Sequence, residues 1–334
     1  MLNLPNSNKL GMSVVFAGLI SINGIAGADA IVKIDGSSTV YPITEAVAED
    51  FQKERKGAVK VTVGISGTGG GFKKFCRGET DIVNASRPIL KKEMDDCKKM
   101  GIQYVEMPIA FDALTVVVNP KNDWSKTITV AELKKIWEPA AQGKITKWSQ
   151  VNPAWPDETI KLYGAGADSG TFDYFTEAIV GKAKSSRGDF TASEDDNVLV
   201  QGVASDKNGL GFFGFAYYAE NKKKLKVVAI DAGKGAVVPS AQTVEDGTYQ
   251  PLSRPVFIYV NIKSAERPEV RQLIEFYMKN APALVQEVKF FPMPAQAYAT
   301  NLKHFAEKKV GTVFGGKPEV NLRIEEVLNR ETSL

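Results

Sequence analysis

The sequence predicts an α/β fold of two lobes joined by two crossing strands. From residue 31 onward, short β-branched segments alternate with helical segments, an order typical of a mostly parallel sheet covered by helices. Two long apolar strands, at residues 111–119 and 255–261, bracket a stretch with helices and strands of its own. We therefore expect lobe 1 to comprise residues 29–112 and 256–334, and lobe 2 residues 113–255. The alternative is that both long strands are central in one large sheet.

The first predicted helix, residues 42–56, shows how the elements are assigned. Ile43, Val47 and Phe51 recur every four residues, and Gly57 ends the pattern, as expected for an amphipathic helix. The other elements expected around it, in chain order, are strands at 31–34, 59–65 and 81–85, helices at 72–77 and 91–100, and a terminal helix within 321–334.

The composition excludes several classes of function. The 334 residues carry 42 basic and 39 acidic side chains, a net charge of +3, which argues against a nucleic-acid binder with a concentrated basic face. There is one histidine, His304, and two cysteines. Zinc sites need three or four clustered ligands, and acid–base enzymes rely on histidine. We therefore expect no metal or other cofactor and no enzymatic activity.

One glycine motif resembles a dinucleotide-binding loop in spacing alone. Residues 209–214 read Gly-Leu-Gly-Phe-Phe-Gly. The nucleotide motif requires a preceding strand, but a polar stretch at 205–208 precedes these residues. Two phenylalanines would also crowd a pyrophosphate. We predict a turn that packs aromatic side chains under lobe 2.

The first 28 residues have the pattern of a secretory signal peptide. Lys9 is followed by an apolar or small stretch at 11–25, and then by Ala26-Gly27-Ala28 and Ala28-Asp29-Ala30, two cleavage sites of the A-x-A kind. The alternative, a membrane anchor, would need about 20 strongly apolar residues. We expect a periplasmic protein, cleaved near Ala28 or Ala30.

Export permits a disulfide, and Cys76 and Cys97 are the one available pair. Closing this loop would stabilise the fold by about 3 kcal/mol. The alternative is two buried free thiols.

Three segments combine hydroxyl side chains with glycine just before predicted helices. They are Gly36-Ser37-Ser38-Thr39-Val40, Ser66-Gly67-Thr68-Gly69-Gly70-Gly71 and Asp168-Ser169-Gly170-Thr171. The first N–H groups of a helix lack partners and attract anions, and hydroxyls add rotatable donors. The alternative is that these residues only cap helices. Because both lobes contribute, we expect the loops to converge on an anion in a cleft between them.

An arginine follows the strand at 81–85 in the segment Ser86-Arg87-Pro88. A guanidinium matches a tetrahedral oxyanion through two parallel hydrogen bonds. We therefore place Ser86 and Arg87 at the cleft edge, the alternative being an exposed arginine without a role.

With these motifs in this order, the chain resembles the phosphate-binding proteins of bacterial phosphate ABC transporters. The resemblance rests on residues 35–42, 66–70, 81–87, 111–112, 168–172 and 209–212. It implies a two-lobed periplasmic-binding-protein fold (type II) and, as partners, inorganic phosphate and membrane permease subunits. We expect a monomer. Carried over by motif, the phosphate ligands would be Ser38, Thr39, the Val40 N–H, Ser66, Ser169, Gly170 and Thr171.

The chain departs from the enterobacterial pattern of this family at two positions. That pattern has aspartate in place of Arg87 and arginine in place of Ala165, so the arginine lies across the cleft, as in one branch of the family. The carboxylate that accepts the phosphate proton is therefore open between Asp112, the first candidate, and Asp168. Monohydrogen phosphate can donate to a carboxylate whereas sulfate cannot, so we expect phosphate to be preferred. Alternatives are a binding protein for sulfate, molybdate or arsenate, and an exported phosphate-ester hydrolase.

Overall fold

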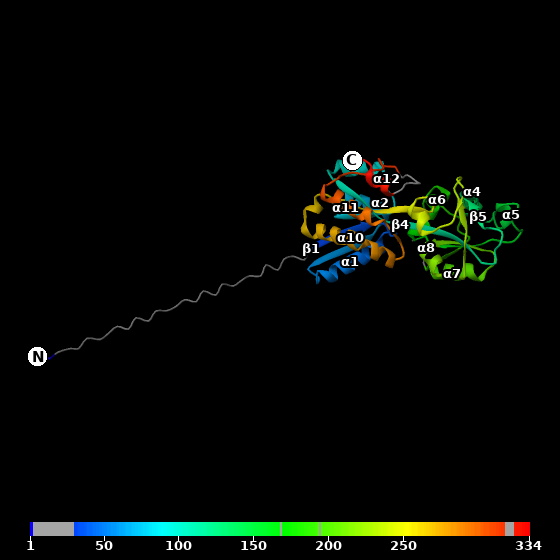
Figure 1. The fold of residues 1–334 in the computed structure, drawn as a ribbon, viewed down its shortest axis with the longest axis horizontal. Helices are drawn as coiled ribbons and strands as arrows, with labels where there is room; N and C mark the ends of the chain where they lie inside the picture. The colour runs from blue at the N-terminus through cyan, green and yellow to red at the C-terminus, as the bar shows by residue number, and fades with distance from the viewer. Residues whose placement is uncertain (3–29, 168, 194, 318–323) are drawn as a thin grey trace.

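Two lobes lie side by side, and strand β4 (Tyr104–Val118) runs from one into the other (Figure 1). This computed structural model describes residues 1–2, 30–167, 169–193, 195–317 and 324–334. Within them, the predicted two-lobed α/β fold is confirmed. Nearly all of the predicted signal peptide, and Asp168, lie outside the described residues.

Each lobe contains a parallel group of strands, which the βαβα order of residues 31–100 predicts for lobe 1. In lobe 1, β1 pairs in parallel with β2 and β3, and in lobe 2, β6 pairs in parallel with β7 and β8. These strands are β1 (Ala30–Gly36), β2 (Val59–Ile65), β3 (Ile82–Ala85), β6 (Lys161–Ala165), β7 (Thr191–Ser193) and β8 (Gly209–Gly214).

The two long strands join these groups through antiparallel pairing. Strand β12 (Ser253–Asn261) lies between β3 and β4, and β4 continues to β8, so one sheet passes through both lobes. Strand β4 pairs with β12 up to Ala113 and with β8 from Leu114 onward. The change of partner lies next to the predicted lobe boundary, which stays a prediction. The two sequence interpretations are therefore compatible, because the crossing strands are also central strands.

Helices cover the sheet in both lobes (Figure 1). Those before β4 or after β12 are α1 (Tyr41–Glu54), α2 (Gly67–Cys76), α3 (Lys91–Lys99), α10 (Pro268–Glu287), α11 (Ala295–Ala306) and α12 (Ile324–Asn329). Those between are α4 (Val130–Trp137), α5 (Trp148–Val151), α6 (Gly170–Val180), α7 (Asp196–Ser205), α8 (Phe215–Glu220) and α9 (Ala241–Glu245). Short strands β5 (Thr127–Thr129), β10 (Ala229–Asp231) and β11 (Ala236–Val237) form a second sheet, while β9 (Lys226–Val227) and β13 (Phe291–Pro292) pair with β4. Two 3₁₀ turns, Pro139–Ala141 and Ser264–Glu266, complete the elements.

The glycine motif at residues 209–214 is a strand, not the predicted turn. These residues form β8, and Phe212 is fully buried with its ring 4.9 Å from that of Trp137. Gly211 has its backbone against β6 and α7, where a Cβ would lie 2.7 Å from Val203 Cγ2. The glycines therefore serve close packing, and the aromatic side chains belong to the core of lobe 2, as expected.

Helix α2 begins earlier than predicted, so the second hydroxyl-and-glycine segment is its first turns and not a loop. Ser66 is the N-cap and the helix starts at Gly67. A Cβ on Gly71 would lie 2.5 Å from Gly36 Cα and 2.8 Å from Val83 Cγ2. Because only glycine permits this approach, helix and sheet pack more closely here than side chains would allow.

The predicted disulfide is present and joins α2 to α3. Cys76, the last residue of α2, is bonded to Cys97 in α3, and both are buried. We predict that alkylation of the native, unreduced protein labels neither cysteine, measured by intact mass, and that full labelling appears after reduction and unfolding. Two labels without reduction would contradict the disulfide.

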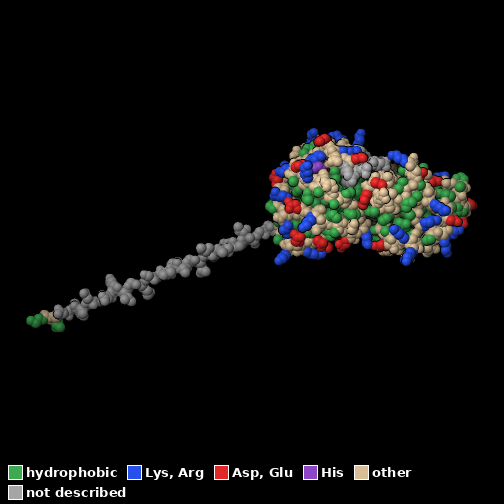
Figure 2. Space-filling view, viewed as in Figure 1, with side chains coloured by type: hydrophobic (Ala, Val, Ile, Leu, Met, Phe, Trp, Pro, Cys, Tyr) green, Lys and Arg blue, Asp and Glu red, His purple; other side chains and the backbone are tan. Residues whose placement is uncertain are grey.

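In the described part of the chain, no helix is both long and apolar enough to cross a membrane. On the face seen in Figure 2, basic and acidic side chains are interspersed.

Candidate anion-binding site

A cleft of about 330 Å³ lies between the lobes and is lined by residues of both. Lobe 1 contributes the start of α1, the crossing strand β4 and the segment after α10, and lobe 2 contributes the starts of α6, α7 and α8. Six of the predicted site residues line it: Ser38, Thr39, Asp112, Ser169, Gly170 and Thr171.

The first hydroxyl loop connects β1 to α1. Gly36, at the end of β1, has a φ of 141°, and a Cβ there would collide with the Asn84 carbonyl, so the turn requires glycine. The Ser37 N–H donates to the same carbonyl at 3.0 Å, which anchors the loop to β3. Val40 is the N-cap residue of α1, and its side chain is fully buried. This anchoring brings Ser38 and Thr39 to the cleft, directly before a helix N-terminus.

The third hydroxyl loop lies opposite, at the N-terminus of α6. Ser169 is the N-cap, and its Oγ accepts a hydrogen bond from the Thr171 N–H at 3.2 Å. A Cβ built on Gly170 would lie 2.9 Å from Ser38 Oγ, 3.1 Å from Thr39 N and still closer to Thr39 Oγ1. The first and third loops therefore meet across the cleft.

The second segment uses its hydroxyls within lobe 1. Ser66 Oγ donates to Asp35, whose other carboxylate oxygen lies 2.6 Å from Lys74 Nζ. Ser86 Oγ lies 3.0 Å from Thr68 Oγ1, and the Ser86 N–H donates to the same oxygen at 3.1 Å. Of the predicted ligands in the described chain, Val40, Ser66, Ser86 and Arg87 do not line this cleft.

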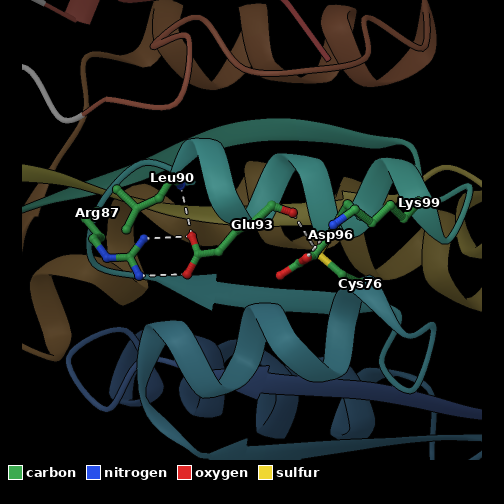
Figure 3. The surroundings of a disulfide bond; sticks show 7 residues. Cys76, Arg87, Leu90, Glu93, Asp96 and Lys99 are labelled. Carbon is green, nitrogen blue, oxygen red and sulfur yellow. Dashed lines mark hydrogen bonds and ion pairs between the residues drawn. A yellow bond between two sulfur atoms is a disulfide. The ribbon is translucent and has the colours of Figure 1, made fainter.

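Arg87 forms a two-pronged ion pair with Glu93 of α3 (Figure 3). Its Nη1 donates to Glu93 Oε2 at 2.9 Å and its Nη2 to Oε1 at 2.8 Å, with both side chains largely buried. Burial opposes the charge of the guanidinium, but Glu93 and, from α6 in the other lobe, Glu177 outweigh this effect and raise the pKa of Arg87. Arg87 thus lies where lobe 1 faces α6, and it has a carboxylate partner that sequence analysis did not identify.

Asp112 lies on the crossing strand β4, opposite a residue that sequence analysis missed, Arg254 of β12. The Asp112 side chain is 9% exposed, and its Oδ2 lies 3.5 Å from Arg254 Nε. Burial raises the pKa of Asp112, and Arg254 acts against this rise. Neither Asp112 Oδ2 nor Arg254 Nε has a hydrogen-bond partner among the described residues. Asp112 thus lines the cleft as a buried carboxylate whose Oδ2 faces Arg254 as an ion pair without a hydrogen bond.

The chemistry of these groups suits binding of an anion. Hydroxyls and helix N-termini supply donors from two directions, and the carboxylate supplies one acceptor. Within the described ranges, no group of three or more His, Cys, Asp or Glu side chains is arranged to hold a metal ion. His304 is half-buried on α11, where burial lowers the pKa of its imidazole.

Comparison with known proteins shows a single family. A family profile described as "PBP superfamily domain" matches residues 23–281. Protein SphX of Synechocystis is 55% identical over 303 residues, 90% of each chain. The phosphate-binding protein PstS of Staphylococcus saprophyticus is 41% identical over 272 residues, 80% of this chain and 82% of its own.

Solved structures also match the chain. A possible phosphate-binding protein from Planctomyces limnophilus is 51% identical with a TM-score of 0.78, covering 84% of this chain and 98% of its own. A phosphate transport receptor from Vibrio cholerae, at 24% identity, shares the fold with a TM-score of 0.64, covering 79% of this chain and 100% of its own. Those relatives whose names state a function are named for phosphate binding or transport and not for catalysis. The chain therefore belongs to the PBP superfamily and, within it, to the family of bacterial phosphate-binding proteins.

Proposed function

We propose that this protein captures inorganic phosphate in the cleft between its lobes and delivers it to the permease of an ABC transporter. The observation that carries the proposal is the meeting of two hydroxyl loops, Ser38-Thr39 from lobe 1 and Ser169–Thr171 from lobe 2, at helix N-termini facing one cleft. Relatives of this chain are named as phosphate-binding proteins, which supports phosphate as the anion.

The proposed ligand set draws on both lobes. Ser38, Thr39 and the Val40 N–H would bind from the first loop, and Ser169, Gly170 and Thr171 from the third. Ser66, Ser86 and Arg87 would complete the site from lobe 1. Asp112 would accept the hydrogen bond from the phosphate proton, which its buried position in the cleft lining supports; Asp168 is the second candidate, outside the described residues.

Closure would be a hinge motion about β4 and β12, the strands that pass between the lobes. Phosphate favours the closed state because only there do both lobes contact it. The N-terminal pattern favours export: the signal peptide would be cleaved after Ala28 or Ala30, and the monomer would work in the periplasm, with its cleft rim facing the permease.

The first test is the choice between phosphate and sulfate. In isothermal titration at neutral pH, we expect strong binding of phosphate and much weaker binding of sulfate, because sulfate has no proton to donate to Asp112 in a desolvated site. Equal affinities for phosphate and sulfate would contradict the proposed role of Asp112 as acceptor. Tighter binding of molybdate or arsenate than of phosphate would contradict phosphate as the ligand. Native mass spectrometry of the freshly purified protein would weigh any anion that it already holds.

A further inference from the structure

The cross-strand pair between Asp112 and Arg254 connects the crossing strands to the far lobe. The register of β4 and β12 places the two residues directly opposite each other. The Arg254 guanidinium stacks on the ring of Tyr174 in α6, 3.6 Å from its centroid, and its Nη1 lies 4.0 Å from Glu177 Oε2. Tyr174 in turn donates its hydroxyl to Pro251 O at 2.9 Å. Arg254 is thereby fixed between both lobes with its side chain 14% exposed.

The protonation state of Asp112 depends on this cation. A carboxyl group buried among apolar strands favours its neutral form, and a nearby cation favours the charged form. Titratable and charged groups on the elements around Asp112 and its cleft are Arg254 on β12, Asp173, Tyr174 and Glu177 on α6, Asp196 on α7, Tyr217 on α8 and Lys289 after α10. Of these, Arg254 is the cation whose contact with the carboxylate is closest, at 3.5 Å.

We propose that Arg254 is a specificity-determining residue: by holding Asp112 as a carboxylate, it reserves one position of the cleft for a ligand that donates a proton. An ionised Asp112 accepts from monohydrogen phosphate and repels sulfate. A neutral Asp112 would instead donate a hydrogen bond, which a fully deprotonated tetrahedral anion can accept. Arg254 acts through Asp112 and is therefore a positioning residue. This inference rests on the proposed function.

The test compares sulfate and phosphate binding by Arg254→Met and the wild type between pH 6 and 8. We expect the sulfate affinity of the variant to exceed that of the wild type by up to about tenfold for each unit that the pKa of Asp112 rises, as long as the pH stays above that raised pKa. The sulfate affinity of the variant itself should increase as the pH falls from 8 to 6, because acid protonates Asp112, while wild-type sulfate binding stays weak. Arg254→Lys should keep the wild-type preference.

A double-variant cycle separates this role from simpler ones. Asp112→Asn should bind sulfate better at every pH, and adding Arg254→Met to it should not change the sulfate-to-phosphate ratio further. The inference is overturned if Arg254→Met changes the sulfate-to-phosphate ratio equally with and without Asp112→Asn. It is also overturned if Arg254→Met weakens the binding of both anions equally at all pH values. Lys134→Met, which removes an exposed cation on α4 outside the cleft lining, is the control and should leave the ratio unchanged. A wild-type protein without phosphate affinity would refute the proposed function itself, a result distinct from these.

Discussion

Replacing Arg87 by alanine is expected to weaken phosphate binding by about 2–5 kcal/mol, the loss typical when one member of a desolvated charged pair is removed. The guanidinium follows β3 and lies close enough to α6 of lobe 2 for Glu177 to affect its pKa. Glu93 fixes its plane through two hydrogen bonds, so its orientation toward the anion would be set before binding. Titration calorimetry of the variant measures the loss.

The ion pair complicates this variant, and a second substitution resolves the difficulty. Arg87→Ala leaves Glu93, whose side chain is 14% exposed, without its cation, which also destabilises lobe 1. Arg87→Ala/Glu93→Gln removes the stranded charge, so thermal unfolding should recover while phosphate binding remains weak. If this double variant binds within about 0.5 kcal/mol of the wild type, Arg87 is only the structural partner of Glu93 and lies outside the site.

The local features of the fold and the site were predictable from sequence. The strand at 59–65 has the predicted bounds, and Ser169 precedes α6 as its pattern indicates. These predictions succeed because hydrophobic periodicity and helix capping depend on neighbouring residues in the chain.

Features that depend on pairing between distant segments were not predictable. The partner of Asp112 is set by the register of β4 and β12, which brings Arg254 opposite it. The glycines of α2 and β8 suggested loops and turns, but they allow close packing against Gly36 and Val203. Glu93 offered a weak signal, because a glutamate three residues into a helix is typical of a cap, and it does accept a hydrogen bond from the Leu90 N–H. Its bond to Arg87 required the folded chain.

Gly170→Val is expected to weaken phosphate binding by about 3 kcal/mol, roughly a hundredfold, because added atoms in a packed contact force the structure apart. Even a single Cβ at this position would lie 2.9 Å from Ser38 Oγ and 3.1 Å from the backbone nitrogen of Thr39. The side chain would therefore hold the two hydroxyl loops apart and prevent lobe 2 from closing on the anion. Because Gly170 begins α6 and has none of the positive φ angles found elsewhere in the chain, valine should leave the fold intact.

The matched control is Gly188→Val, on the exposed surface of lobe 2, where a Cβ would meet Gln142 Oε1 at an ordinary 3.5 Å. It should bind phosphate as the wild type does. X-ray scattering with and without phosphate gives an independent measure: the wild type and the control should become more compact on binding, whereas Gly170→Val should not. If Gly170→Val bound phosphate normally and still became compact, the two loops would not need to meet around the ligand. Normal phosphate binding without that compaction would instead mean that the anion is held by one lobe.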